Sequence, residues 1–131
     1  MTDEHHRHLA LLEAFAAAWN AHDLPALMRC VTDDCLFRAS SGPLPCGVEY
    51  RGRREIEQGF PMIWTLFPDA SWSGVRHFVS GERGASEWTF RGTRPDGTRV
   101  EVLGCDLFDF RDGRIAVKNT FRKEKALTRS T

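Results

Sequence analysis

The sequence contains no apolar run as long as a membrane-spanning helix needs and no signal-peptide core near Met1. Neither charge is in excess, because 18 lysine and arginine residues balance 18 aspartate and glutamate residues. This neutral balance does not support a nucleic-acid partner or an acidic membrane surface. We therefore expect a cytoplasmic protein that binds neither nucleic acid nor membrane.

Cysteines spaced for a metal or redox site are also absent. The four cysteines, which show no CxxC spacing, are Cys30, Cys35, Cys46 and Cys105. They are expected to be reduced residues of the core. His5, His6 and His8 lie close together, but no carboxylate framework accompanies them. The sequence thus predicts neither a metal site nor another cofactor.

Internal repeats and low-complexity segments are missing as well. The length of 131 residues fits one domain with one core. We expect a single domain over 1–131, with frayed ends at 1–4 and 124–131.

Helices are predicted first and strands afterwards. Apolar residues at helical spacing predict a helix over 5–20, Asp23 is the expected N-cap of a second helix, and Pro61 divides a third over 52–66. Strands are expected at 35–39, 48–51, 70–79, 85–94, 99–110 and 114–122. Turns at Asp96-Gly97 and Asp112-Gly113 are typical of hairpins. Helices followed by antiparallel strands predict an α+β fold.

Asp106 is an acidic residue on a predicted strand face that is otherwise apolar. Side chains of a strand point alternately to its two faces. Asp106, Phe108 and Phe110 are two residues apart in the predicted strand over 99–110, so they lie on the same face. A carboxylate among apolar side chains is costly unless it is paired or takes part in chemistry. Asp106 is therefore a candidate catalytic acid or base, or else a structural buried carboxylate or a ligand-orienting acceptor.

The two Asp-Gly turns predict which residues flank Asp106. A two-residue or four-residue loop at Asp96-Gly97 places Glu87 opposite Asp106, and a two-residue turn at Asp112-Gly113 places Asn119 on its other side. Two carboxylates roughly 4.5–5.5 Å apart at Cβ cannot both ionise cheaply. One would keep a proton near neutral pH, which gives an acid beside a base.

Other interpretations of these neighbours remain open. Glu87 can instead pair with Arg91 or Arg76 in an ion network, and Asn119 can orient a ligand without taking part in chemistry. The register of His77 depends on the turn over 80–84. One register places His77 beside Glu87 on the inner face as part of a proton-transfer cluster, and the other turns it outward.

Two groups of apolar residues predict partners. The first group suits a pocket for a small apolar or aromatic ligand, although ordinary core packing would use the same residues: Phe15, Trp19, Phe37, Phe60, Trp64, Phe67, Trp72 and Phe108. The second group forms an outer sheet face that no helix is left to cover: Trp88, Phe90, Leu103, Cys105 and Leu107. We expect a homodimer through this face.

Several motifs resemble those of the nuclear transport factor 2-like superfamily, and most of all its SnoaL-like, ketosteroid-isomerase-like branch. They are Asn20-Ala21-His22-Asp23-Leu24, Thr32-Asp33-Asp34, Tyr50-Arg51-Gly52, Gly104-Cys105-Asp106-Leu107-Phe108 and Asp112-Gly113-Arg114-Ile115. The resemblance implies a cone-shaped cystatin-like fold. In this fold three N-terminal helices pack in the concave face of a strongly bent, mainly antiparallel sheet, and the cone's interior is the ligand pocket.

The resemblance also implies roles for single residues. Asp106 matches the protonated aspartic acid in the oxyanion hole of the isomerases and is similar to the acid/base carboxylate proposed for SnoaL-like cyclases. Phe15 stands where the isomerases have a tyrosine donor, and Ala39 stands where they have the aspartate base. Steroid isomerase activity is therefore not expected. The expected function is a cofactor-free acid/base enzyme for a small apolar carbonyl compound (isomerase, aldol-type cyclase or dehydratase); the alternative is a non-catalytic ligand-binding or dimerisation domain.

Overall fold

The structure is a computed structural model that describes residues 2–125. Its helices are α1 (Asp3–Ala21), α2 (Leu24–Arg29), α3 (Gly52–Gly59) and α4 (Met62–Leu66). Its strands are β1 (Val31–Arg38), β2 (Glu49–Arg51), β3 (Ser71–Ser80), β4 (Arg83–Thr93), β5 (Arg99–Arg111) and β6 (Arg114–Arg122). This is the α+β, cystatin-like fold that the sequence predicts.

Capping residues and Pro61 set the helix ends. The Thr2 hydroxyl accepts a hydrogen bond from the His5 N–H (3.1 Å), so α1 already includes Asp3 and Glu4. The expectation that residues 1–4 fray is therefore wrong for these two. Asp23 caps α2 as predicted, with its carboxylate accepting from the Ala26 N–H at 3.1 Å. The third predicted helix divides at Pro61 into α3 and α4. The predicted tail over 126–131 lies outside the described residues.

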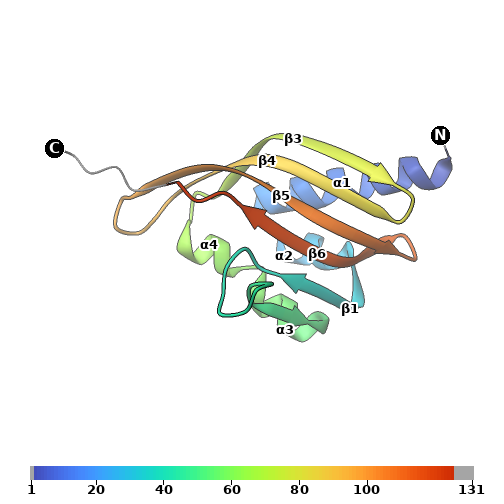
Figure 1. Cartoon of the computed structure of the whole chain (residues 1–131), viewed down its shortest axis with the longest axis horizontal. Coiled ribbons are helices and arrows are strands. Elements are labelled where there is room, and N and C mark those ends of the chain that lie inside the picture. The colour runs from blue at the N-terminus through green and yellow to red at the C-terminus, as the bar shows by residue number, and fades with distance from the viewer. Residues whose placement is uncertain (1, 126–131) are drawn as a thin grey trace.

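The sheet is mixed, with the strand order β2-β1-β6-β5-β4-β3. All its neighbouring strands are antiparallel except β1 and β6, which run parallel. Figure 1 shows the long strands β3 to β6 arching over α1, with α3 beside β1. The pairing with β6 begins at Val31, so β1 starts earlier than the predicted strand over 35–39 and includes the Thr32-Asp33-Asp34 motif.

The motif after α1 fastens the helix to the sheet. The Asn20 amide donates to the carbonyl oxygen of Trp72 (2.9 Å) and accepts from the Trp72 N–H (2.8 Å). His22 adopts the left-handed conformation (φ 54°), and its Nε2 lies 2.8 Å from the carbonyl oxygen of Ala70. The motif therefore fixes where α1 ends against the start of β3.

The core lies between the helices and the inner face of the sheet. Its larger part includes Leu12, Phe15, Trp19, Phe60 and Phe108. Its smaller part consists of Phe67, Ala70, Trp88, Phe90 and Val102. Two of the four free thiols, those of Cys30 and Cys35, are also buried, and burial raises the pKa of Cys35 to about 12.

The outer face of the sheet differs from the predicted one. Trp88 and Phe90 are buried on the inner face, with 7% and 0% of their surface exposed. The prediction was wrong for these two because β4 pairs with β5 one residue away from the expected register. Leu103, Cys105 and Leu107 do alternate with the buried residues of β5, and Leu103 is 56% exposed.

None of the helices within residues 2–125 is long and apolar enough to cross a membrane.

Candidate active site

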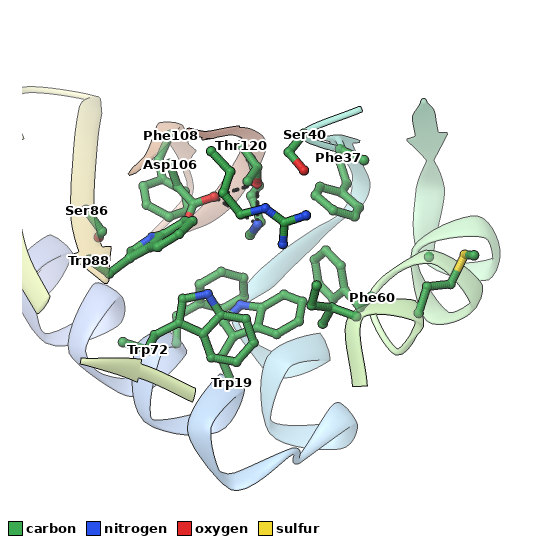
Figure 2. Close-up of a pocket in the computed structure, with 18 of the residues that line it drawn as sticks. Trp19, Phe37, Ser40, Phe60, Trp72, Ser86, Trp88, Asp106, Phe108 and Thr120 are labelled. Atoms are coloured by element: carbon green, nitrogen blue, oxygen red, sulfur yellow. Dashed lines mark hydrogen bonds and ion pairs between the residues drawn. The ribbon is translucent and has the colours of Figure 1, made fainter. Parts of the chain in front are cut away.

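A cavity of about 250 Å³ lies between the helices and the inner face of the sheet. This volume is just below the usual range for small-molecule sites, about 300–1,000 Å³. Figure 2 shows Asp106 and Thr120 on one side of the cavity, with Trp19 and Trp72 on the opposite side. The wall is mainly apolar, and among residues 2–125 only three charged side chains line it, those of Asp106, Lys118 and Arg122.

Asp106 is the centre of a hydrogen-bonded cluster in this wall. Its Oδ1 accepts from Lys118 Nζ at 2.9 Å and from Thr120 Oγ1 at 2.5 Å, while its Oδ2 accepts from Trp88 Nε1 at 3.0 Å. Lys118 Nζ also donates to Thr120 Oγ1 at 2.6 Å. Asp106 and Lys118 are only 7% and 5% exposed. The site therefore holds a desolvated carboxylate and a desolvated ammonium group that pair with each other.

Aromatic rings hold the Lys118 ammonium group on its other side. Nζ lies 4.6 Å from the centre of the Phe37 ring and 5.1 Å from that of Trp19. Such cation–π contacts replace part of the lost hydration of a buried cation. Of the three N–H donors of the lysine, two are used by Asp106 and Thr120, so one remains for a ligand oxygen.

Glu87 is not the neighbour of Asp106. Thr93 pairs with Arg99, so the hairpin loop over 94–98 has an odd number of residues rather than two or four. The Arg94 N–H donates to the Thr98 carbonyl oxygen across this loop (2.9 Å). Since side chains alternate along a strand, this shift turns Glu87 to the outer face and places Ser86 opposite Asp106. Glu87 pairs there with Arg76 (3.2 Å), as one alternative interpretation had it.

Asn119 is misplaced by the same kind of shift. The turn itself has the predicted register, with Phe110 opposite Ile115, but a β-bulge follows, and Asp109 pairs with Val117. The bulge leaves Ala116 unpaired and reverses the facing of every later residue of β6. Thr120 therefore lies opposite Asp106, and Asn119 lies opposite Leu107 on the outer face.

His77 lies on the inner face but does not line the cavity. It pairs with Ser86, and its Nδ1 lies 2.7 Å from the Ser86 hydroxyl oxygen. This pairing differs from both registers predicted from the sequence, but His77 still faces inward. Burial lowers the pKa of His77, and the nearby Glu13 carboxylate opposes this shift. The observed polar row is therefore His77–Ser86–Asp106–Thr120, in place of one through Glu87 and Asn119.

Most of the predicted pocket aromatics do line the cavity: Phe15, Trp19, Phe37, Phe60, Trp72 and Phe108. Two do not. Trp64 stacks on His22 with ring centres 5.0 Å apart, and Phe67 packs against Phe90 with ring centres 5.1 Å apart. Both belong to the packing behind the wall. Ala39 lines the cavity together with Phe15, and neither offers a polar side-chain atom.

Sequence reasoning missed Lys118, Thr120, Ser86 and Arg122 as residues of the wall. Ile115 faces inward. If the side chains of β6 alternated from Ile115 without a bulge, every even-numbered residue of the strand would face outward. Nothing in the local sequence marks the bulge. The sequence indicates how long the strand is, but the length of a strand does not fix which residues pair across it.

Metal ligands are not gathered anywhere in residues 2–125, where no group of three or more His, Cys, Asp or Glu residues is placed to hold an ion.

Solved structures with the same fold were found. A "putative polyketide cyclase" from Xanthomonas campestris pv. campestris has a TM-score of 0.80 at 19% identity, with 91% of this chain and 92% of that chain covered. A nuclear transport factor 2-like protein of unknown function from Mesorhizobium loti has a TM-score of 0.77 at 25% identity, with 95% and 97% covered. A protein with a ketosteroid isomerase-like fold from Catenulispora acidiphila, solved in complex with trimethylamine, has a TM-score of 0.74 at 18% identity, with 85% and 83% covered. No curated protein matches the chain.

The SnoaL-like domain family matches residues 12–118, which is well over half of the chain. That span runs from α1 to β6 and includes Asp106 and Lys118. The chain belongs to the SnoaL-like domain family.

Proposed function

We propose that the chain is a cofactor-free acid/base enzyme that acts on a small, largely apolar carbonyl compound. The reaction class is proton transfer next to the carbonyl, leading to isomerisation, aldol-type cyclisation or dehydration. The observation that carries the proposal is the buried pair of Asp106 and Lys118, 2.9 Å apart, in the wall of an otherwise mainly apolar cavity.

The two charged groups suit the two ends of such a reaction. Asp106 takes a proton from the carbon beside the carbonyl, and the electron pair of that C–H bond moves onto the carbonyl oxygen. The Lys118 ammonium stabilises this enolate oxygen with its remaining N–H. Asp106 then returns the proton to another carbon in an isomerisation or to the new alkoxide in an aldol addition. In a dehydration it gives the proton to the β-hydroxyl group, which leaves as water as the enolate electrons form the C=C bond. Each proton removed is thus given back, and no co-reactant is needed.

The acceptor capacity of Asp106 is consistent with this role. An ionised carboxylate has about four lone-pair sites. Three are occupied by Lys118, Thr120 and Trp88, and the one left lies on Oδ2. The name of the Xanthomonas relative points to the same reaction class. Phe15 and Ala39 lack the groups that steroid isomerisation would use at their positions, so we do not propose that reaction.

Exchange of α-protons for deuterium tests the proposal without knowledge of the natural substrate. In D2O the protein should accelerate exchange at the α-carbon of a small aromatic ketone such as 2-tetralone, followed by NMR. Asp106→Asn removes the base and should slow this exchange by about 100-fold or more. Asp109→Asn is the matched control, because Asp109 lies in the same strand and pairs with Arg83 at 3.1 Å on the outer face. A folded Asp106→Asn protein that exchanges as fast as the unsubstituted protein would contradict the mechanism.

The second candidate function is a non-catalytic binding domain for an apolar metabolite. It is favoured by the three hydrogen bonds that Asp106 accepts, which stabilise its carboxylate without any ligand. Under this alternative the protein binds the ketone but does not accelerate exchange. The same experiment therefore separates the two functions.

We also propose a homodimer through the outer face of the sheet. Leu103, Phe121 and Phe78 are each half exposed or more there, at 56%, 51% and 50%. Apolar residues gathered on one exposed sheet face are a common feature of protein–protein interfaces. Light scattering during size-exclusion chromatography should give the mass of a dimer at micromolar concentration, and Leu103→Asp should give a monomer. A monomer without the substitution would contradict this proposal.

A further inference from the structure

Arg122, the last residue of β6, is the one cavity residue whose charge has no partner in residues 2–125. No carboxylate in this part of the chain lies within 4.0 Å of it, and its guanidinium makes no hydrogen bond there. It lies over aromatic rings instead, 5.0 Å from the centre of Phe90 and 6.0 Å from that of Phe67. A guanidinium carries five N–H donors, and all of them are available here.

The cavity wall therefore has a net positive charge. Its three charged groups are Asp106, Lys118 and Arg122, and the first two neutralise each other at 2.9 Å. Burial and the positive charge of Arg94 both lower the pKa of Arg122. These are the effects of a cation that is partly desolvated without an anion beside it. A bound anion would stabilise the charged guanidinium and so offset both effects.

We propose that the cavity selects an organic acid, in which an apolar ring body carries a carboxylate that binds Arg122. Arg122 is then a specificity-determining residue. A carboxylate accepts two parallel N–H bonds from a guanidinium, which is stronger and more directional than a bond to a neutral group. The carbonyl end of the same molecule would lie against Lys118 and Asp106, and this part of the inference rests on the proposed function.

The spacing along β6 sets the size of this ligand. Lys118, Thr120 and Arg122 face the cavity at every second position of the strand. With a rise of about 3.3 Å per residue, the Cα atoms of Lys118 and Arg122 are roughly 13 Å apart. A bicyclic or tricyclic oxo acid covers this span once the two side chains reach toward it. Figure 2 shows that Trp19 and Trp72 form the wall opposite, which suits a flat body.

Binding of a matched pair of aromatic probes tests the inference without turnover. The probes are 2-naphthoic acid, which is anionic at pH 7, and 2-naphthamide, which is neutral and of nearly the same shape. Quenching of tryptophan fluorescence or calorimetry gives both dissociation constants. We expect the acid to bind at least about tenfold more tightly than the amide.

Substitutions of Arg122 test whether this residue causes the tighter binding of the acid. Arg122→Gln should weaken binding of the acid by about tenfold and leave binding of the amide within roughly twofold, so the preference disappears. Arg122→Lys should keep part of it, since an ammonium is a cation without the planar fork. Arg94→Gln is the matched control, because Arg94 lies near Arg122 but does not line the cavity. It should leave a clear preference for the acid.

Three results would overturn the inference: equal binding of acid and amide, an unchanged preference in Arg122→Gln, or no binding of either probe at about 1 mM. Its failure can be told apart from failure of the proposed function. Acid preference is read from binding, whereas the function is read from Asp106-dependent deuterium exchange. An enzyme that exchanges α-protons but binds both probes equally would retain its proposed function and lose this specificity.

Discussion

Lys118→Met should lower the free energy of unfolding by about 3 kcal/mol at pH 7, because it leaves the buried Asp106 carboxylate without its counter-charge. Methionine keeps most of the apolar stem that packs beside Phe37 and Trp19, so the loss reports mainly on the charge. Urea denaturation followed by far-UV circular dichroism measures the change. Lys123→Met is the control at an exposed lysine and should change stability by no more than roughly 0.5 kcal/mol.

A double-mutant cycle separates the ion pair from packing. Asp106→Leu alone leaves Lys118 buried without its carboxylate and should also be strongly destabilising. The double variant Asp106→Leu with Lys118→Met removes both charges, and its loss should be at least about 1 kcal/mol smaller than the sum of the single losses. Additive losses would show that cavity water solvates the two groups, which would contradict the desolvated site described above.

Gly104→Ala should also destabilise the protein, with a loss of about 1–3 kcal/mol in unfolding free energy. A Cβ at this position would lie 2.5 Å from two ring carbons of Trp88 and 2.7 Å from the carbonyl oxygen of Phe121. The indole would have to move, and its hydrogen bond to Asp106 Oδ2, now 3.0 Å, would be lost. We therefore also expect slower α-proton exchange. Denaturation, the near-UV spectrum of tryptophan and the exchange assay measure the three effects.

Trp88→Phe provides the matched background for this prediction. Phenylalanine lacks the outer ring carbons that an alanine at position 104 would meet, so Gly104→Ala should cost less in the Trp88→Phe protein. Cys105→Ala, next in the strand but facing outward, should leave the Trp88 spectrum unchanged. An unaltered near-UV spectrum in Gly104→Ala would show that the sheet, and not the indole, gives way.

The helices and strands could be predicted from local patterns, since their causes are local. Apolar spacing marked α1, the carboxylate of Asp23 marked the start of α2, and Pro61 divided α3 from α4. The start of β1 at Val31 could not be predicted in this way, because its partner β6 lies more than 80 residues along the chain. Non-local pairing of this kind leaves little trace in the strand itself.

Within the candidate site, the buried position of Asp106 could be predicted from the sequence, but its neighbours could not. Alternation along β5 was enough to place Asp106 with Phe108 on the buried face, because side-chain facing within one strand has a period of two residues. The same period made its neighbours uncertain. Because the loop over 94–98 has one residue more than the longer of the two predicted loops, Ser86 and not Glu87 lies opposite Asp106. Because of the bulge at Ala116, Thr120 and not Asn119 lies on the other side of Asp106.

The sequence by itself therefore determined the fold class, the SnoaL-like resemblance and the buried carboxylate on which the candidate site is centred. Only the tertiary structure decided which groups surround that carboxylate: a lysine, a threonine and an indole in place of a second acid and an amide. The physical reason is that a single-residue slip in strand register turns each side chain to the opposite face. Loop length and bulge position, which control that slip, are settled by the packing of the whole sheet.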